Sequence, residues 1–272
     1  MKKAIYSYIF KPLKINGLKL KNRITMAPLY LGYAASGGKI SSMLLYHYRL
    51  MAQSGAGLIV VENASIASGG SGSARTIRCD HNRYLPGLSQ LAAKIKGQKS
   101  RACLQINHAG RFAQVSDPVA PSAVAAFQRT PRVLTRKEIK TIQKQFANAA
   151  LRAKKAGFDM VELHGGTGYL LAQFLSPRTN KRSDIYGGSL SNRIRFPLEV
   201  LKQVQDAVGD FPVGYRFLAV EWLPDGLQLT FELALENHAL IDDGGDAIQE
   251  LTGLGEFLGV DGGRRKQCHA YA

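Results

Sequence analysis

Residues 135–164 read TRKEIKTIQKQFANAALRAKKAGFDMVELH, and this stretch predicts a helix that leads directly into a buried strand. Thr135 and Glu138 form the pattern of a capping box, which marks the start of a helix. MVELH at 160–164 is short and apolar, as expected for a strand that is covered on both faces. The helical repeat places six apolar residues on one face of this helix, namely Ile139, Ile142, Phe146, Ala149, Ala150 and Ala153.

Similar apolar runs recur along the chain, with helical patterns between them. They are RITMA at 23–27, GLIVVE at 57–62, ACLQI at 102–106, VGYRF at 213–217 and DAIQEL at 246–251. Strands that alternate with helices favour a parallel sheet with right-handed crossovers. Asn16-Gly17 predicts a β-hairpin ahead of the first strand, where it would plug one end of a barrel. We expect an α/β fold, a (β/α)8 TIM barrel with about six of its eight strands present.

The composition favours one large domain, because the chain has 272 residues and is 45% hydrophobic. We place this domain at 1–251 and an atypical tail at 252–272. No apolar run approaches the ~18 residues of a membrane span, and the first residues lack a secretory signal, so we expect a cytoplasmic protein. Cys79, Cys103 and Cys268 are widely separated, and we expect neither a metal site nor a disulfide framework.

The formal charge of +16 favours anionic partners, which include nucleic acid, acidic membranes and phosphorylated cofactors or substrates. The basic residues are scattered rather than gathered in one block, and no RNA-binding signature accompanies them. We therefore expect no nucleic-acid partner and no membrane partner.

Polar residues follow several of the predicted strands, at the end where barrels of this kind carry their active sites. Gln105, His164, Tyr169 and Arg216 would together offer hydrogen-bond donors to a planar heterocycle with carbonyl or anionic oxygens. Taken singly, each has a structural alternative. Arg216 could close an ion pair with Glu162 or Glu221, and Tyr169 could be a packed ring whose hydroxyl binds a backbone carbonyl. Dinucleotide, phosphate-loop, serine-hydrolase and zinc-protease motifs do not occur.

Five segments of the chain, in order, resemble the NADH:flavin oxidoreductase (Old Yellow Enzyme) family. They are FKPLKINGLKLKNRITMAPL, GLIVVENASI, LQINHAGR, AGFDMVELHGGTGYLLAQFLSPRTNKRSDIYGGSLSNRIRF and PVGYRF. The resemblance covers roughly residues 8–251 and looks closest to the bacterial branch that includes 2,4-dienoyl-CoA reductases. It implies an ene-reductase in which NADH or NADPH reduces bound FMN, and the hydride passes to an α,β-unsaturated carbonyl compound or enoyl thioester.

The resemblance also assigns residues to the cofactor. Those assigned to FMN are Ala27, Pro28, Leu29, Tyr30, Asn63, Gln105 and Arg216. The first three would contact the flavin ring largely through the backbone, and Tyr30 and Asn63 would lie near its O4 and N5 edge. Gln105 would pair with the pyrimidine part, and Arg216 would place its charge beside N1 and O2.

Three residues would act on the substrate. His164 matches the residue that hydrogen-bonds the substrate carbonyl, and Tyr169 matches the proton donor to the α-carbon. Thr167 stands where the family usually has a second His or Asn, so one carbonyl donor is replaced by a shorter hydroxyl.

The last 21 residues, 252–272, do not resemble the seventh and eighth strands of the family or the loops that hold the flavin phosphate. A frameshift or a fragment would explain this difference. Two other hypotheses therefore stay open: an inactive remnant that no longer holds flavin, and a basic anion-binding scaffold. The sequence decides neither the physiological substrate, nor NADH against NADPH, nor whether the protein forms a homo-oligomer or needs a partner chain.

Overall fold

A computed structural model of the protein describes residues 7–223 and 225–227. Its main sheet runs in chain order, with every neighbouring pair of strands parallel. The strands are β3 (Thr25–Met26), β4 (Leu58–Ser65), β6 (Arg101–Asn107), β9 (Met160–Gly165) and β10 (Val213–Phe217). These confirm five of the predicted strands, and the sixth, at 246–251, lies outside the described residues.

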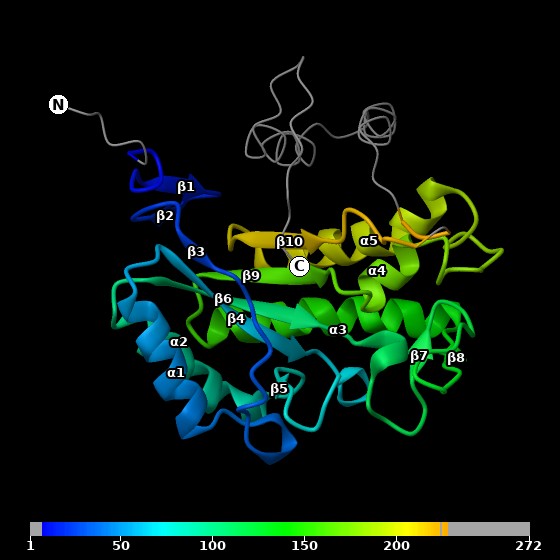
Figure 1. Ribbon diagram of the computed structural model, residues 1–272, viewed down its shortest axis with the longest axis horizontal. Helices are drawn as coiled ribbons and strands as arrows, with labels where there is room; N and C mark the ends of the chain where they lie inside the picture. Colours follow the sequence, from blue (N-terminus) through cyan, green and yellow to red (C-terminus); the bar gives the residue numbers. More distant parts are fainter. Residues whose placement is uncertain (1–6, 224, 228–272) are drawn as a thin grey trace. The chain divides into compact units, whose positions relative to one another are not determined.

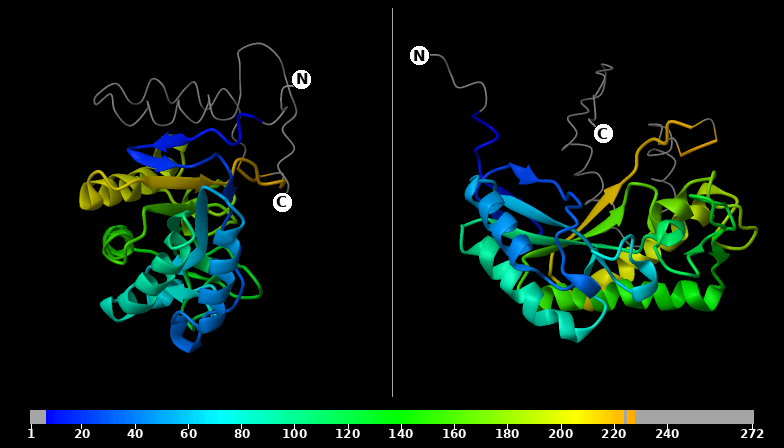
Figure 2. Two further views of the ribbon diagram at one scale, coloured as in Figure 1. Left: turned by 90° about the vertical axis from the view of Figure 1, so that its left-hand side faces the viewer. Right: turned by 60° about the horizontal axis from the view of Figure 1, so that its bottom comes forward.

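Helices cover the outer face of this curled sheet (Figures 1 and 2). The α-helices are α1 (Ser42–Gln53), α2 (Leu85–Lys96), α3 (Arg136–Lys155), α4 (Leu170–Leu175) and α5 (Leu190–Val208). Their apolar faces and one face of the strands form the main core, which includes Phe146, Ile59 and Leu104. Every crossover thus returns the chain to the next parallel strand, which confirms the α/β fold of the (β/α)8 barrel class. No described helix is long and apolar enough to cross a membrane.

Short elements occupy the connections. These are η1 (Ser36–Gly38), η2 (Ser68–Gly70), η3 (Asn82–Tyr84), η4 (Gly110–Phe112) and the strands β5 (Ile77–Arg78), β7 (Val119–Ala120) and β8 (Arg132–Val133). The strand β5 pairs with the end of β4, and β7 pairs with β8. Most of these short elements lie in two connections. The connection after β4 contains η2, β5 and η3, and the connection after β6 contains η4, β7 and β8.

The predicted hairpin is present as β1 (Leu13–Ile15) and β2 (Leu18–Leu20), which pair antiparallel around Asn16-Gly17. Both turn residues have positive φ, 38° for Asn16 and 82° for Gly17, as a tight hairpin requires. The hairpin packs on a second apolar cluster formed by residues near the start of the strands, such as Leu58, Cys103 and Met160. It therefore covers the inner face of the sheet at its amino-terminal end, as the sequence predicted.

The capping box of α3 is formed as predicted. The Thr135 hydroxyl accepts a hydrogen bond from the Glu138 backbone N–H at 3.2 Å, and the Glu138 carboxylate accepts one from the Thr135 N–H at 2.8 Å. Arg132 adds an ion pair to Glu138, and this pairing lowers the pKa of the Glu138 carboxyl to about 2. All six apolar positions predicted for the inner face of the helix are buried.

One boundary was wrong. The sequence predicted that the second strand ends at Glu62, but β4 continues to Ser65. The pairing of β4 with β6 shifts between Val61 and Ala64, which is a bulge in β4. Glu62 and Asn63 therefore lie inside the strand, at the bulge, and both are buried.

The capping box generates a test of the fold. Replacing Thr135 with Ala removes a side-chain acceptor from the first turn of α3, so we expect the free energy of unfolding to fall by about 1 kcal/mol. Urea unfolding followed by circular dichroism measures the change. Thr141→Ala is the matched control, because that hydroxyl bonds only to the carbonyl of Lys137 within the same helix. Equal losses for both variants would contradict the assignment of the cap.

Candidate functional site

The carboxyl ends of β6, β9 and β10 are joined by one carboxylate. Glu162 Oε1 accepts hydrogen bonds from Gln105 Nε2 at 2.8 Å and from Arg216 Nε at 3.0 Å. A second contact joins Arg216 Nη2 to Glu162 Oε2 at 3.3 Å. The structural alternative for Arg216 is thus present in the structure, with Glu162 as the partner. The same contact fixes Arg216 beside Gln105, and about 40% of its side chain remains exposed at the mouth of the sheet.

His164 lies on the same face of β9 as Glu162, and it is buried. Its Nδ1 accepts a hydrogen bond from the Gly166 backbone N–H at 3.4 Å, which leaves the proton of the neutral ring on Nε2. Burial, together with the charge of Arg216, lowers the pKa of His164 to about 4. The imidazole is therefore neutral at pH 7 and presents Nε2–H as a hydrogen-bond donor.

Thr167 and Tyr169 stand next to this donor. Thr167 Oγ1 lies 3.4 Å from His164 Nε2, and the residue has a positive φ of 57°, which is unusual for a β-branched residue. The Tyr169 ring packs edge-on against His164, with 5.1 Å between the ring centroids. Within the described residues the Tyr169 hydroxyl makes no hydrogen bond to protein, so the alternative of a tyrosine that binds a backbone carbonyl finds no support there. Burial and the neighbouring Tyr30 raise the pKa of Tyr169.

The segment after β3 is open to solvent at the same mouth. Leu29 is 63% exposed and Tyr30 is 45% exposed, high values for large apolar and aromatic side chains. The Tyr30 hydroxyl contacts the Ser73 hydroxyl in the connection after β4. Ala27 is exposed and Pro28 is half-buried, so the whole predicted cofactor segment borders an uncovered surface.

Two buried acceptor atoms at the mouth have no partner within the described residues, namely Glu62 Oε1 and Asn107 Oδ1. The other Glu62 oxygen accepts only from the Leu31 N–H, at 3.4 Å. Burial raises the pKa of Glu62 to about 7. Buried polar atoms are nearly always satisfied in folded proteins, so these atoms, with the donors on Gln105 and Arg216, fit a site that is completed by a polar heterocycle.

Gln173 in α4 holds the two main loops of the site together, and it is not among the site residues predicted from the sequence. Its side-chain amide donates to the carbonyls of Gly168 at 2.7 Å and Ala109 at 3.2 Å, and its Oε1 accepts from the Arg111 N–H at 3.1 Å. Gly110 permits this approach, since a Cβ there would lie 2.2 Å from Gln173 Oε1. The available signal was one buried polar residue within the otherwise apolar run LLAQFL.

The chain is similar to known proteins of one family. Residues 8–250 match the NADH:flavin oxidoreductase / NADH oxidase family. An NADH oxidase of Thermoanaerobacter brockii is 41% identical over 227 residues, which are 80% of this chain and 35% of that protein. The solved structure of a 2-naphthoyl-CoA reductase with 2-naphthoyl-CoA is similar, with a TM-score of 0.81 and 29% identity, over 87% of this chain and 39% of that one.

A second solved structure is that of morphinone reductase in complex with tetrahydroNAD. It has a TM-score of 0.75 and 33% identity, and the match covers 81% of this chain and 66% of the morphinone reductase chain. The present chain thus spans about a third of the length of the NADH oxidase and two thirds of morphinone reductase.

The raised pKa of Glu62 predicts how stability depends on pH. An acid whose pKa is higher in the folded state favours folding at low pH, and this contribution is lost as pH rises from the unfolded value of 4.5 to about 7. We expect wild-type protein to lose about 2 kcal/mol between pH 5 and pH 8 relative to Glu62→Gln, which has no charge to bury. Urea unfolding of both proteins at the two pH values measures this. Parallel pH profiles would contradict the burial of an ionisable carboxyl here.

Proposed function

The chain belongs to the NADH:flavin oxidoreductase / NADH oxidase family, and from this premise we propose that it binds FMN and reduces activated alkenes with NADH or NADPH. The activated alkene is an α,β-unsaturated carbonyl compound or an enoyl thioester. One observation carries this proposal. A neutral imidazole donor, His164, and a protonated phenol, Tyr169, lie side by side next to an unsatisfied polar mouth.

The residues at the mouth fit the flavin by their chemistry. Gln105 and Arg216 would meet the polar edge of the ring, and their positions are set by Glu162 between them. The flavin ring would lie against Ala27, Pro28, Leu29 and Tyr30. Bound flavin would bury the exposed side chains of Leu29 and Tyr30. Asn63, at the bulge of β4, would contribute to the same edge as Tyr30. FMN, when bound, supplies the exchange of hydride between the nicotinamide and the alkene.

The chain itself would polarise the substrate and deliver the proton. His164 Nε2–H would donate to the substrate carbonyl, with the Thr167 hydroxyl as a second, shorter donor. Tyr169 would give its phenolic proton to the α-carbon, for which its raised pKa keeps it protonated at neutral pH. Phe112 also packs edge-on against Tyr169, with 6.2 Å between the ring centroids, and would help to hold the phenol in place.

Bound flavin is the first test. We expect purified protein, after desalting, to absorb in the near ultraviolet and the blue as oxidised flavin does, or to gain these bands after incubation with FMN. Arg216→Gln should weaken FMN binding by about tenfold, because a charge-assisted contact is lost. Arg195→Gln on α5 is the control, because it removes the same charge at a residue that is not assigned to FMN. Protein that is colourless and takes up no FMN would contradict the proposal for this chain.

The role of Tyr169 is tested by removing only its hydroxyl. Tyr169→Phe should slow alkene reduction about 100-fold, since general acids contribute that much or more, while reduction of the flavin by NAD(P)H stays within about twofold of wild type. Stopped-flow spectroscopy separates these two half-reactions. Tyr46→Phe, on the exposed face of α1, is the control. An equal loss in both half-reactions would assign Tyr169 to structure rather than to proton delivery.

A further inference from the structure

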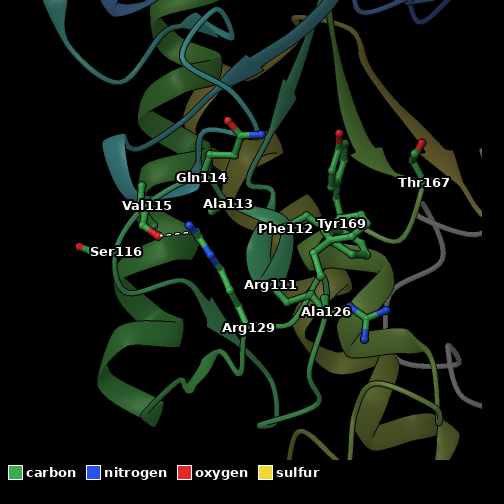
Figure 3. A pocket seen from close by; sticks show the side chains of 12 residues that line it. Arg111, Phe112, Ala113, Gln114, Val115, Ser116, Ala126, Arg129, Thr167 and Tyr169 are labelled. Carbon is green, nitrogen blue, oxygen red and sulfur yellow. Dashed lines mark hydrogen bonds between the residues drawn. The ribbon is translucent and has the colours of Figure 1, made fainter.

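A cavity of about 810 Å³ opens beside Tyr169 and Thr167, away from the strands (Figure 3). Its walls come from η4, from the segment that follows it at 113–116, and from a turn at 126–129. A cavity of this size holds a ligand as large as a nucleotide. None of the residues assigned to FMN lines it, so it is a separate compartment next to the proposed proton donor.

The charged residues that line the cavity are both cationic, Arg111 and Arg129, and no carboxylate lines it. Within the described residues neither arginine has an acidic partner at salt-bridge distance. Arg111 Nε is buried without any hydrogen-bond partner. Arg129 is exposed and reaches across the rim to the carbonyl of Val115 at 3.1 Å, a contact drawn in Figure 3. The cavity is therefore positively charged and keeps guanidinium donors free for an anion.

Aromatic rings line the same cavity in a row. The Phe127 and Phe112 ring centroids are 5.4 Å apart, and Phe112 contacts Tyr169 at 6.2 Å. The Arg111 guanidinium lies 4.8 Å from the Phe112 ring centroid. The row thus runs from the solvent-exposed rim to the proposed proton donor, and its outermost ring, Phe127, is exposed and can stack against a flat base.

The outermost ring, that of Phe127, lies in a turn with a strained backbone. Phe127 is 84% exposed, and it shares with Gln128 a two-residue turn in which both have positive φ, 48° and 63°. Ala126 and Arg129 close the turn with reciprocal backbone hydrogen bonds of 2.8 and 2.9 Å. Gly, Asn or Asp ordinarily fill such turns, because other side chains are strained there. Strain of this kind is common at ligand-binding sites.

We propose that this cavity binds the adenosine diphosphate portion, with its additional ribose phosphate, that NADPH and coenzyme A thioesters have in common. The adenine ring stacks on Phe127 and Phe112, and the phosphates meet the guanidinium groups of Arg129 and Arg111. The inference rests on the proposed function, because it places the reactive end of the same ligand beside Tyr169 and His164. NADPH as reductant and a coenzyme A thioester as substrate are its two sources.

Binding can be measured without catalysis. Titration calorimetry of the purified protein with 2′-phospho-ADP-ribose and, separately, with free coenzyme A tests the two sources. We expect saturable binding of at least one. Its Kd should rise about tenfold in Arg129→Gln, which loses a charge-assisted contact, and in Phe127→Gly, which loses the stacking ring while relieving the turn. Arg23→Gln, before β3 at the opposite end of the strands, has the same charge change and should bind as wild type.

The outcomes separate this inference from the proposed function. Preference for 2′-phospho-ADP-ribose assigns the cavity to NADPH, and preference for coenzyme A assigns it to the substrate. Failure of both to bind, or equal binding by wild type, Arg129→Gln and Phe127→Gly, overturns the subsite. Reoxidation of dithionite-reduced holoprotein by cyclohexenone, which has no nucleotide part, reports on the proposed function alone. Its loss together with intact nucleotide binding would overturn that function and leave the subsite standing.

Discussion

The register of the parallel ladder through β6, β9 and β10 is the constraint on which the rest of the site depends. The ladder pairs Gln105 with Glu162 and His164 with Arg216. Side chains alternate between the two faces of a strand, so a slip of one residue would move every one of these groups into the helix-covered core. The alternating apolar residues Leu104, Val161 and Leu163 resist such a slip, because they are fully buried in that core. The core therefore fixes the site.

The inner face of the sheet divides into two levels of different chemistry. At the amino-terminal level, the hairpin and residues such as Val60 and Cys103 form a dry cluster. One level higher, the half-buried Glu162 carboxylate pairs with Arg216 and accepts a hydrogen bond from Gln105. Beyond the strands, Gln173 satisfies three backbone groups from two loops that would otherwise be buried alone. The apolar cluster, the Glu162 contacts and the Gln173 contacts thus follow one another from the amino-terminal end of the sheet to the loops of the site.

Sequence reasoning succeeded where the cause was local and failed where it was tertiary. The capping box at Thr135 and the Asn16-Gly17 hairpin depend on neighbours within four residues, and both were predicted. The alternation of strands and helices also predicted the parallel sheet. The bulge in β4 was missed because it is defined only against β6. The turn at Phe127 was missed because neither of its central residues is a usual turn former. The roles of the predicted site residues stay predictions.

The sheet order has a consequence for how the chain acquires its structure. In the main sheet, β4, β6, β9 and β10 pair in turn with β3, β4, β6 and β9, and each crossover between these strands contains at least one α-helix. Among the described strands of this sheet, none has to wait for a distant partner, so ordered structure can grow from β3 onward while the ribosome is still adding residues, at about 5–20 per second. The edge strand of the sheet is then β4, next β6 and next β9, and each new strand pairs with an edge strand that is already in place. Protein synthesis and sheet growth thus proceed in the same direction.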